Sequence, residues 1–164
     1  MQIAVVDSSP LIHLTHLGLG RELSLFFDIV YVPRAVQREV NKKGRFRYRL
    51  KKLYETGLFV RCIAVDETNV RILQAELGEG EAEGLIQGQE RQPQYFIGDD
   101  KRARDIAEAM GAKPIGTLRI LARLNLQGQA AELRTLVRKL ERDLGFRASD
   151  KVVQQAIAMA GEPI

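Results

Sequence analysis

Short apolar runs alternate with segments of helical periodicity along this chain, and that order limits its fold more than any other feature. The first run, Ile3 to Val6, ends in Asp7-Ser8-Ser9-Pro10, which is typical of a buried strand that turns directly into a helix. Strands that alternate with helices predict an α/β fold with a parallel sheet of four to five strands. We predict strands over residues 2–6, 28–32, 59–65, 95–97 and 113–116.

Helical periodicity fills most of the sequence between and after these runs. We expect the first helix to have Ser9 as its cap and Pro10 at its first position. A chain of 164 residues is expected to form a single domain, with a core over about 1–125 and a helical part over about 126–164. Helices are predicted over residues 10–18, 21–27, 33–40, 67–77, 79–86, 99–111, 117–125, 130–144 and 149–160.

Composition places the chain among ordinary globular proteins, with 45% hydrophobic and 28% charged residues. A single cysteine, Cys62, excludes an internal disulfide and a thiolate metal site. No stretch approaches the roughly 18 consecutive apolar residues that a membrane helix needs, and the first apolar run has no basic region before it. We therefore expect a cytoplasmic protein that does not associate with membranes.

Basic charge is concentrated in one part of the chain. Residues 34–61 carry ten Lys and Arg residues against Glu39 and Glu55. Aromatic residues are interleaved with these cations, a pattern suited to phosphate contacts and base stacking. The same residues also fit an amphipathic helix that docks its apolar side on the domain while its charges face water. The apolar positions of that helix would be Phe46, Leu50, Leu53 and Tyr54.

Four acidic elements lie where apolar runs meet turns or on helices with apolar neighbours. Ligands of open α/β sheets bind beyond the carboxyl ends of the strands, so a fold of this class can bring such acids to one crevice. Crowded carboxylates repel one another unless a positive charge compensates them, and hard oxygen donors select Mg²⁺ or Mn²⁺. The four elements are Asp7, Glu39, the group Glu79, Glu81 and Glu83, and the pair Asp99 and Asp100.

The order of several short motifs resembles the PIN-domain superfamily, and most closely a prokaryotic PIN-like branch related to VapC-type toxin ribonucleases. The similarity spans nearly the whole chain. It rests on Val5-Val6-Asp7-Ser8-Ser9-Pro10-Leu11-Ile12, Val32-Pro33-x-Ala35-Val36-x-x-Glu39, Gly78-Glu79-Gly80-Glu81-Ala82-Glu83, Asp99-Asp100-Lys101-Arg102-Ala103-Arg104, Ile115-Gly116-Thr117-Leu118 and Gly145-Phe146-Arg147-x-Ser149-Asp150.

This resemblance implies a three-layer α/β/α fold with extra C-terminal helices and an acidic site that binds metal. By residue-by-residue matching, Asp7, Glu39, Glu81 and Asp100 correspond to the four catalytic acids, and Asp7, Glu81, Asp99 and Asp100 to the metal ligands. Ser8 takes the family's small hydroxyl position, and Glu79 and Glu83 are neighbours of Glu81 that can substitute for it. One position departs from the family pattern, because Gly98 stands where many members have Thr or Ser.

From the residues and the resemblance together we predict an endoribonuclease that depends on Mg²⁺ or Mn²⁺. The expected partners are RNA, a small antitoxin protein and a second copy of the chain in a homodimer. The apolar residues Leu133, Leu136, Val137 and Leu140 are suited to packing on the domain, to dimer formation or to binding that antitoxin. Two alternatives remain open, a non-catalytic PIN-like module that binds RNA or protein, and a DNA nuclease. The predicted RNA-binding residues are Lys42, Arg45, Arg47, Arg49, Lys51 and Lys52.

Overall fold

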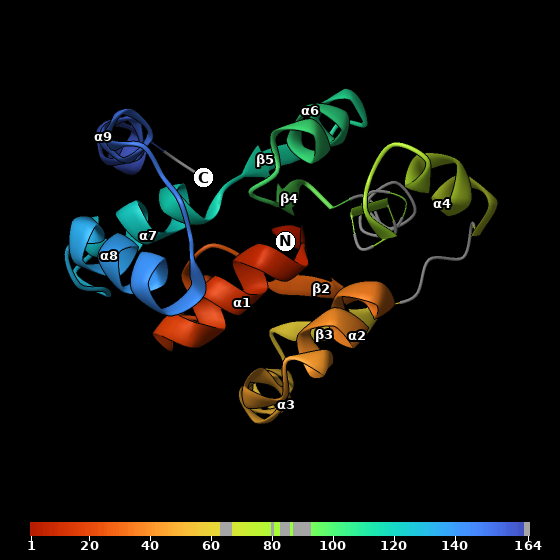
Figure 1. Cartoon of the computed structure of the whole chain (residues 1–164), viewed down its shortest axis with the longest axis horizontal. Coiled ribbons are helices and arrows are strands. Elements are labelled where there is room, and N and C mark those ends of the chain that lie inside the picture. The colour runs from red at the N-terminus through yellow and green to blue at the C-terminus, as the bar shows by residue number, and fades with distance from the viewer. Residues whose placement is uncertain (63–66, 80, 83–85, 87–92, 163–164) are drawn as a thin grey trace.

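The computed structural model describes residues 1–62, 67–79, 81–82, 86 and 93–162, with the side chains of residues 67–70 left out. Within these residues, five strands form one sheet in the order β3-β2-β1-β4-β5, and every neighbouring pair is parallel (Figure 1). This confirms the predicted α/β fold. The strands are β1 (Ile3–Val6), β2 (Ile29–Pro33), β3 (Phe59–Cys62), β4 (Tyr95–Ile97) and β5 (Lys113–Ile115).

Helices connect the parallel strands and continue beyond the last one. The longest of the described helices, α8, has 12 residues, and none of them is long and apolar enough to cross a membrane. The helices are α1 (Ser8–Leu17), α2 (Arg34–Lys42), α3 (Arg47–Tyr54), α4 (Glu67–Gln74), α6 (Lys101–Ala109), α7 (Thr117–Leu126), α8 (Leu133–Leu144) and α9 (Asp150–Ala158), with 3₁₀ turns η1 (Arg21–Leu25), η2 (Gly44–Phe46) and η3 (Met159–Gly161).

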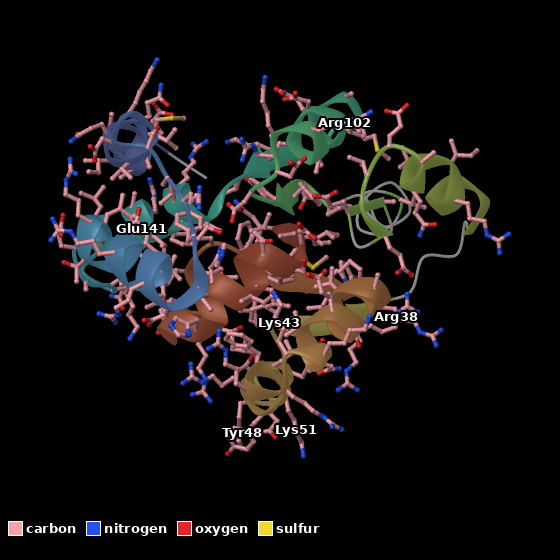
Figure 2. The ribbon with its side chains drawn as sticks, viewed as in Figure 1. Arg38, Lys43, Tyr48, Lys51, Arg102 and Glu141 are labelled. Atoms are coloured by element: carbon pink, nitrogen blue, oxygen red, sulfur yellow. The ribbon has the colours of Figure 1, made fainter. Side chains whose placement is uncertain are left out.

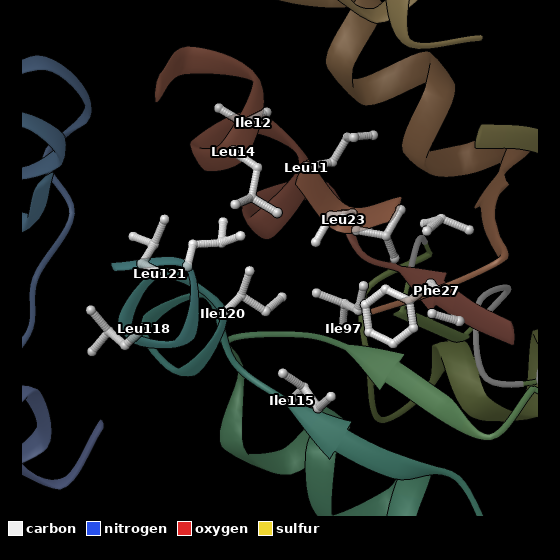
Figure 3. Close-up of a cluster of buried hydrophobic side chains, with 14 of the residues drawn as sticks. Leu11, Ile12, Leu14, Leu23, Phe27, Ile97, Ile115, Leu118, Ile120 and Leu121 are labelled. Carbon is white, nitrogen blue, oxygen red and sulfur yellow. The ribbon is translucent and has the colours of Figure 1, made fainter. Parts of the chain in front are cut away.

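Alternate residues of the central strands point to opposite faces of the sheet, as the pleat requires. Val6 of β1 and Ile97 of β4 belong to the larger core, in which α1 and α7 pack against the sheet (Figure 3). Val5 and Phe96 belong to a smaller core on the other face, together with Ala103 of α6. Helices therefore cover both faces of the sheet, in the three layers expected of a PIN-like fold.

The C-terminal helices pack on the domain rather than standing apart from it. The four apolar residues of α8 that the sequence singled out are buried in the larger core. Helices α7, α8 and α9 lie side by side at one end of the molecule (Figure 1). Of the three roles considered for these residues, packing on the domain, dimer formation and antitoxin binding, the structure shows packing on the domain. The buried residues are Leu133, Leu136, Val137 and Leu140.

The basic segment also docks on the body of the protein. Phe46, Leu50 and Leu53 are buried in the larger core, and Tyr54 packs against it. The side chain of Arg49 donates hydrogen bonds to the backbone oxygens at the C-terminal end of α1. The predicted amphipathic helix is therefore present as α3, except that Phe46 lies in the preceding turn η2.

Helix α1 begins two residues earlier than the sequence predicts. Asp7, not Ser9, occupies the cap position, and Ser8 is the first helical residue. Pro10 is consequently the third residue of the helix. This placement costs no hydrogen bond, because the first backbone N–H groups of a helix have no partner within it. The earlier start holds Asp7 at the junction between β1 and α1.

Candidate active site

Asp7 lies at the carboxyl end of the sheet, between its two central strands. Its backbone N–H donates to the oxygen of Ile97 at 2.9 Å, and the register pairs Val6 with Ile97. Its carboxylate does not cap α1, although Asp7 is the cap residue. The residue is only 7% exposed. The fold therefore buries a carboxylate at the strand end and leaves its oxygens available to the adjoining pocket.

The pocket beside Asp7 has a volume of about 330 Å³ and receives acids from three parts of the chain. Asp7 comes from the β1–α1 junction, Glu39 from α2, and Glu79 and Glu81 from the turn that follows Gly78. Ser8 is also part of its lining. The structure thus brings together three of the four predicted acidic elements.

The pKa of Asp7 is raised from 3.8 to about 7, chiefly by burial and also by repulsion from Glu81, Glu39 and Asp99, against a hydrogen bond from the Ser8 backbone that lowers it. The carboxylates of the four predicted elements therefore act on one another, although only some line the same pocket. A shift of one pKa unit corresponds to about 1.4 kcal/mol, so ionising Asp7 at neutral pH costs several kcal/mol in the absence of a compensating cation.

Two cations of α2 share this pocket with the acids. Arg38 and Lys42 are four residues apart on the helix and both contribute to the lining. Arg38 forms an ion pair with Glu79, and both partners are about half exposed. The pocket therefore offers groups for a metal ion and groups for a phosphate within one opening.

The turn after Gly78 fixes Glu81 locally. One carboxylate oxygen of Glu81 accepts a hydrogen bond from the Gly78 backbone at 3.0 Å, and the Ala82 backbone donates to the Gly78 oxygen at 3.0 Å. This is the geometry of a capped first turn. Glu83, the remaining predicted acid of this group, lies outside the described residues.

Asp99 follows β4 and is held by groups from two other helices. Its carboxylate accepts hydrogen bonds from the Thr117 backbone at 2.8 Å and the Thr117 hydroxyl at 2.7 Å, and lies 3.2 Å from Nδ1 of His13. Burial would raise the pKa of Asp99, but the hydrogen bonds from His13 and Thr117 outweigh it and hold the pKa below its ordinary value. Asp99 therefore remains a charged neighbour of Asp7.

Asp100 has a different role in this structure. It is exposed, and its carboxylate accepts a hydrogen bond from the Ala103 backbone at 2.9 Å as the cap of α6. Neither Asp99 nor Asp100 is among the described residues that line the pocket at Asp7. Of the two predicted ligands after β4, Asp99 is the one whose charge acts on Asp7.

Gly98 is explained by packing. A Cβ atom at this position would lie 2.3 Å from the ring of Phe96, far inside van der Waals contact. Phe96 belongs to the smaller core on the face that α6 covers. The aromatic ring therefore fills the space that the side chain of a Thr or Ser would need.

The pocket beside Asp7 is lined by the type of donor atom that a hard divalent cation prefers. Asp7, Glu39 and Glu81 supply carboxylate oxygens, and a cation would offset both the burial and the repulsion that raise the pKa of Asp7. Among the described residues, no three His, Cys, Asp or Glu side chains already stand close enough to hold a metal ion. Glu39 and Glu81 would therefore have to move toward Asp7 to share one.

The comparison with protein families decides the class of the chain. A family model described as PIN domain matches residues 3–162. The chain belongs to the PIN-domain superfamily. This confirms the resemblance to the superfamily but does not test the closer relation to VapC-type toxins. PIN domains are typically nucleases that use divalent metal ions. No curated protein and no solved structure matches the chain at a comparable level.

Three residues of the site were not expected from the sequence. Arg38 lines the pocket together with Lys42, four positions on along α2, while Thr117 and His13 reach Asp99 from distant segments. The motif around Thr117 was part of the PIN-like pattern, but nothing local connects it with Asp99. Helix spacing alone could have identified Arg38 as a neighbour of Lys42.

The structure also separates the predicted RNA-binding residues. Lys42 lines the pocket at Asp7, and Arg47 and Lys51 line a second pocket. Arg45 lies over the ring of Phe46, and Arg49 is bonded to α1. The sixth residue, Lys52, forms an ion pair with Glu55 at 2.9 Å.

Proposed function

We propose that this PIN domain is a Mg²⁺- or Mn²⁺-dependent endoribonuclease that cleaves at the pocket beside Asp7. The observation that carries the proposal is the convergence of Asp7, Glu39 and Glu81 with Arg38 and Lys42 in one opening. Carboxylates for a cation and cations for a phosphate are the two requirements of metal-assisted phosphodiester hydrolysis.

The residues of the pocket have separate tasks in this proposal. Asp7 and Glu81 would hold the cation, which when bound supplies Lewis acidity toward water and the scissile phosphate. Glu39, exposed at the rim, orients the attacking water through its carboxylate. Arg38 and Lys42 bind phosphate oxygens of the strand. Attack by water with departure of the 3′ oxygen leaves 5′-phosphate and 3′-hydroxyl ends.

Cleavage of single-stranded RNA by the purified protein tests the proposal. The wild type should cleave with Mn²⁺ or Mg²⁺ and should be inactive in chelator, and Asp7→Asn should be inactive under both conditions. Asp28→Asn is a control that removes an acid away from the pocket, because Asp28 is exposed and its carboxylate accepts a hydrogen bond from the Gln2 backbone. Cleavage that persists in Asp7→Asn or in chelator would refute the mechanism, and a DNA substrate assayed in parallel tests the deoxyribonuclease alternative.

A non-catalytic binding role is the second candidate, and one observation favours it. Glu79 is paired with Arg38, Glu81 is bonded to Gly78, and no three of the described acids stand ready to hold a metal. In that case the wild type and Asp7→Asn would bind RNA or protein equally well and neither would cleave.

We further propose a role as a toxin that a small antitoxin protein silences. An unrestrained ribonuclease harms its host, and an Arg or Lys side chain inserted beside Asp7 and Glu81 would compete with the cation. Expression of the wild type alone should slow growth in the cytoplasm of a bacterial host, whereas Asp7→Asn should not. Equal growth of both strains at equal expression would argue against a toxin. Sedimentation of the purified protein tests the proposed homodimer.

A further inference from the structure

A second pocket lies on the other side of α2 from the site at Asp7. Its volume is about 700 Å³, within the range of ligand sites in proteins. Helix α2 contributes residues to both pockets, but from different faces: Arg38 and Lys42 face the first, while Gln37 and Asn41 lie about a third of a turn away and line the second. One helix therefore forms the wall between the two openings.

The lining of this second pocket, which we name the α3 pocket, combines cations with aromatic rings. Arg47 and Lys51 come from α3 and Arg61 from the edge strand β3. No acid of the described residues forms an ion pair with Arg47 or Lys51. Tyr48, whose ring is part of the lining, is 68% exposed. Positive charge and an exposed aromatic ring therefore occur in one concave site, with the amine of Lys52 lying 5.7 Å from the centroid of that ring.

Some cations of the basic segment line this pocket, and others bind partners elsewhere in the protein. Arg49 and Lys52, on the same helix, are bonded to the α1 backbone and to Glu55. Tyr48 and Lys51 extend from α3 away from the body of the protein (Figure 2). Of the four cations on α3, Arg47 and Lys51 are the two without such partners in the described part of the chain, and both line the α3 pocket. A uniformly solvated helix face would not show this distribution.

The remaining groups suit the edge of a base. The amide nitrogen of Gln37 donates to the Val32 oxygen at 2.9 Å, which leaves its carbonyl oxygen to accept a hydrogen bond. Asn41 offers an amide with both a donor and an acceptor. The guanidinium of Arg61 lies 4.5 Å from the centroid of the Tyr54 ring, which fixes both groups at the back of the pocket. Burial raises the pKa of Tyr54 to about 12 although Arg61 lowers it, so this hydroxyl stays protonated.

We propose that the α3 pocket binds one phosphorylated nucleoside, with the phosphate on Arg47 and Lys51 and the base on the ring of Tyr48. The nucleotide is either a unit of the RNA strand that crosses α2 into the pocket at Asp7 or a free nucleotide. The first source rests on the proposed ribonuclease function, and the second does not. Stacking of bases on aromatic rings beside cations is the usual means of holding single strands without reading sequence.

RNA binding by the Asp7→Asn protein in chelator tests the pocket without interference from cleavage. The probe is a fluorescent single-stranded RNA of about 12 nucleotides. Arg47→Ala/Lys51→Ala and Tyr48→Ala should each raise Kd at least about fivefold, and Tyr48→Phe should keep the original value. The double variant should also flatten the salt dependence by about 0.7 for each lost phosphate contact. Circular dichroism confirms that each variant is folded.

The control removes the same charge outside the pocket. Arg138→Ala/Lys139→Ala removes one Arg and one Lys from the exposed face of α8, and should change Kd by less than about twofold. Equal losses in the pocket and control variants would overturn the proposal. So would displacement of the RNA by an acidic peptide of the same charge as effectively as by unlabelled RNA, since that would identify a general anion surface.

A mononucleotide separates the two sources. If adenosine 5′-monophosphate binds the Asp7→Asn protein by calorimetry and Tyr48→Ala abolishes the binding, the pocket takes a free nucleotide. If only the oligonucleotide depends on the pocket residues, the nucleotide belongs to the strand. Wild type that binds RNA through the pocket but never cleaves would reject the nuclease and keep the pocket. Wild type that cleaves, together with pocket variants of unchanged Kd, would reject the pocket alone.

Discussion

Asp99 caps a helix to which it does not belong: its carboxylate accepts both the backbone N–H and the hydroxyl of Thr117, the first residue of α7, at 2.8 and 2.7 Å. The strand end that contributes a charge to the acidic site is thereby tied to the helix that leads into the C-terminal part. A negative charge at a helix N-terminus is favoured by the unpaired N–H groups there. The bond thus has a structural role and keeps Asp99 ionised beside Asp7.

Removal of the Thr117 hydroxyl should destabilise the protein while the helix remains. Thr117 is fully buried, and Thr117→Val keeps its shape but loses the bond to Asp99. We expect a loss of roughly 1.5–3 kcal/mol in the free energy of unfolding, the range for hydrogen bonds to charged groups. Urea unfolding at neutral pH measures the loss. Thr117→Ser, which keeps the hydroxyl, serves as the control and should lose much less.

The same pair predicts a pH dependence of stability. The pKa of Asp99 is lowered in the folded protein, so its contribution is present above the pKa of the unfolded chain, about 3.9, and is lost as the pH falls through the lower folded value. The stability difference between the wild type and Thr117→Val should therefore be constant near neutral pH and shrink below about pH 4. A difference that does not change with acidification would show that Asp99 is not the partner responsible.

Ionisation of Asp7 should change the stability with pH in the opposite direction. Its pKa is raised in the fold to about 7, so ionisation of Asp7 costs stability increasingly as the pH rises from about 4 to about 7. In chelator, Asp7→Asn should be more stable than the wild type by roughly 2–4 kcal/mol at about pH 8 and much closer to it at about pH 5. Urea midpoints at the two pH values measure this. Mn²⁺ should raise the stability of the wild type and not of Asp7→Asn.

Local patterns in the sequence were enough to place the sheet and its acidic edge. The apolar runs that end at Asp7 and before Asp99 predicted β1 and β4, because a strand period and the residues that stop it are properties of a few neighbouring positions. The parallel order then placed both strand ends at one edge, and the register of Val6 with Ile97 confirms it. The positions of β1, β4 and the acidic edge of the sheet thus follow from residues that are close in sequence.

Other features depend on contacts between distant segments. Asp99 and Asp100 are chemically identical neighbours, and only the approach of Thr117 from α7 and of the Ala103 backbone decides what each carboxylate binds. Arg47 and Arg49 are likewise half a helical turn apart on α3, so Arg47 faces the α3 pocket and Arg49 faces the end of α1. No periodicity of the sequence contains that information.

Gly98 should resist substitution because of its neighbour. Gly98→Ser places a Cβ atom against the Phe96 ring, with a Cβ-to-carbon distance of 2.3 Å before relaxation, and overpacking of this kind typically costs about 1–3 kcal/mol. A drop in the thermal midpoint measures the cost. In a Phe96→Leu background the same substitution should cost clearly less, although Phe96→Leu is itself destabilising. If the two costs are equal in both backgrounds, the ring is not the obstacle.

A comparison of two exposed ion pairs can distinguish a role in substrate binding from a role in stability. Arg38 pairs with Glu79 at the acidic pocket, and Arg102 pairs with Glu76 beside α6, with all four side chains between 49% and 61% exposed (Figure 2). Exposed pairs contribute little to folding, so Arg38→Ala and Arg102→Ala should each change the free energy of unfolding by less than about 1 kcal/mol.

Their effects on RNA cleavage should differ because only Arg38 lines the pocket at Asp7. Arg38→Ala should lower kcat/KM about tenfold or more, since a charge-assisted bond to a phosphate oxygen is lost, and Arg102→Ala should stay within about twofold of the wild type. Steady-state cleavage of a short RNA in Mn²⁺ measures both variants. Arg38→Lys should recover part of the loss, because it restores the charge without the planar fork of donors. Equal rates for Arg38→Ala and Arg102→Ala would mean that the phosphate does not enter beside Glu79, and the catalytic opening would then have to be sought on another side of Asp7.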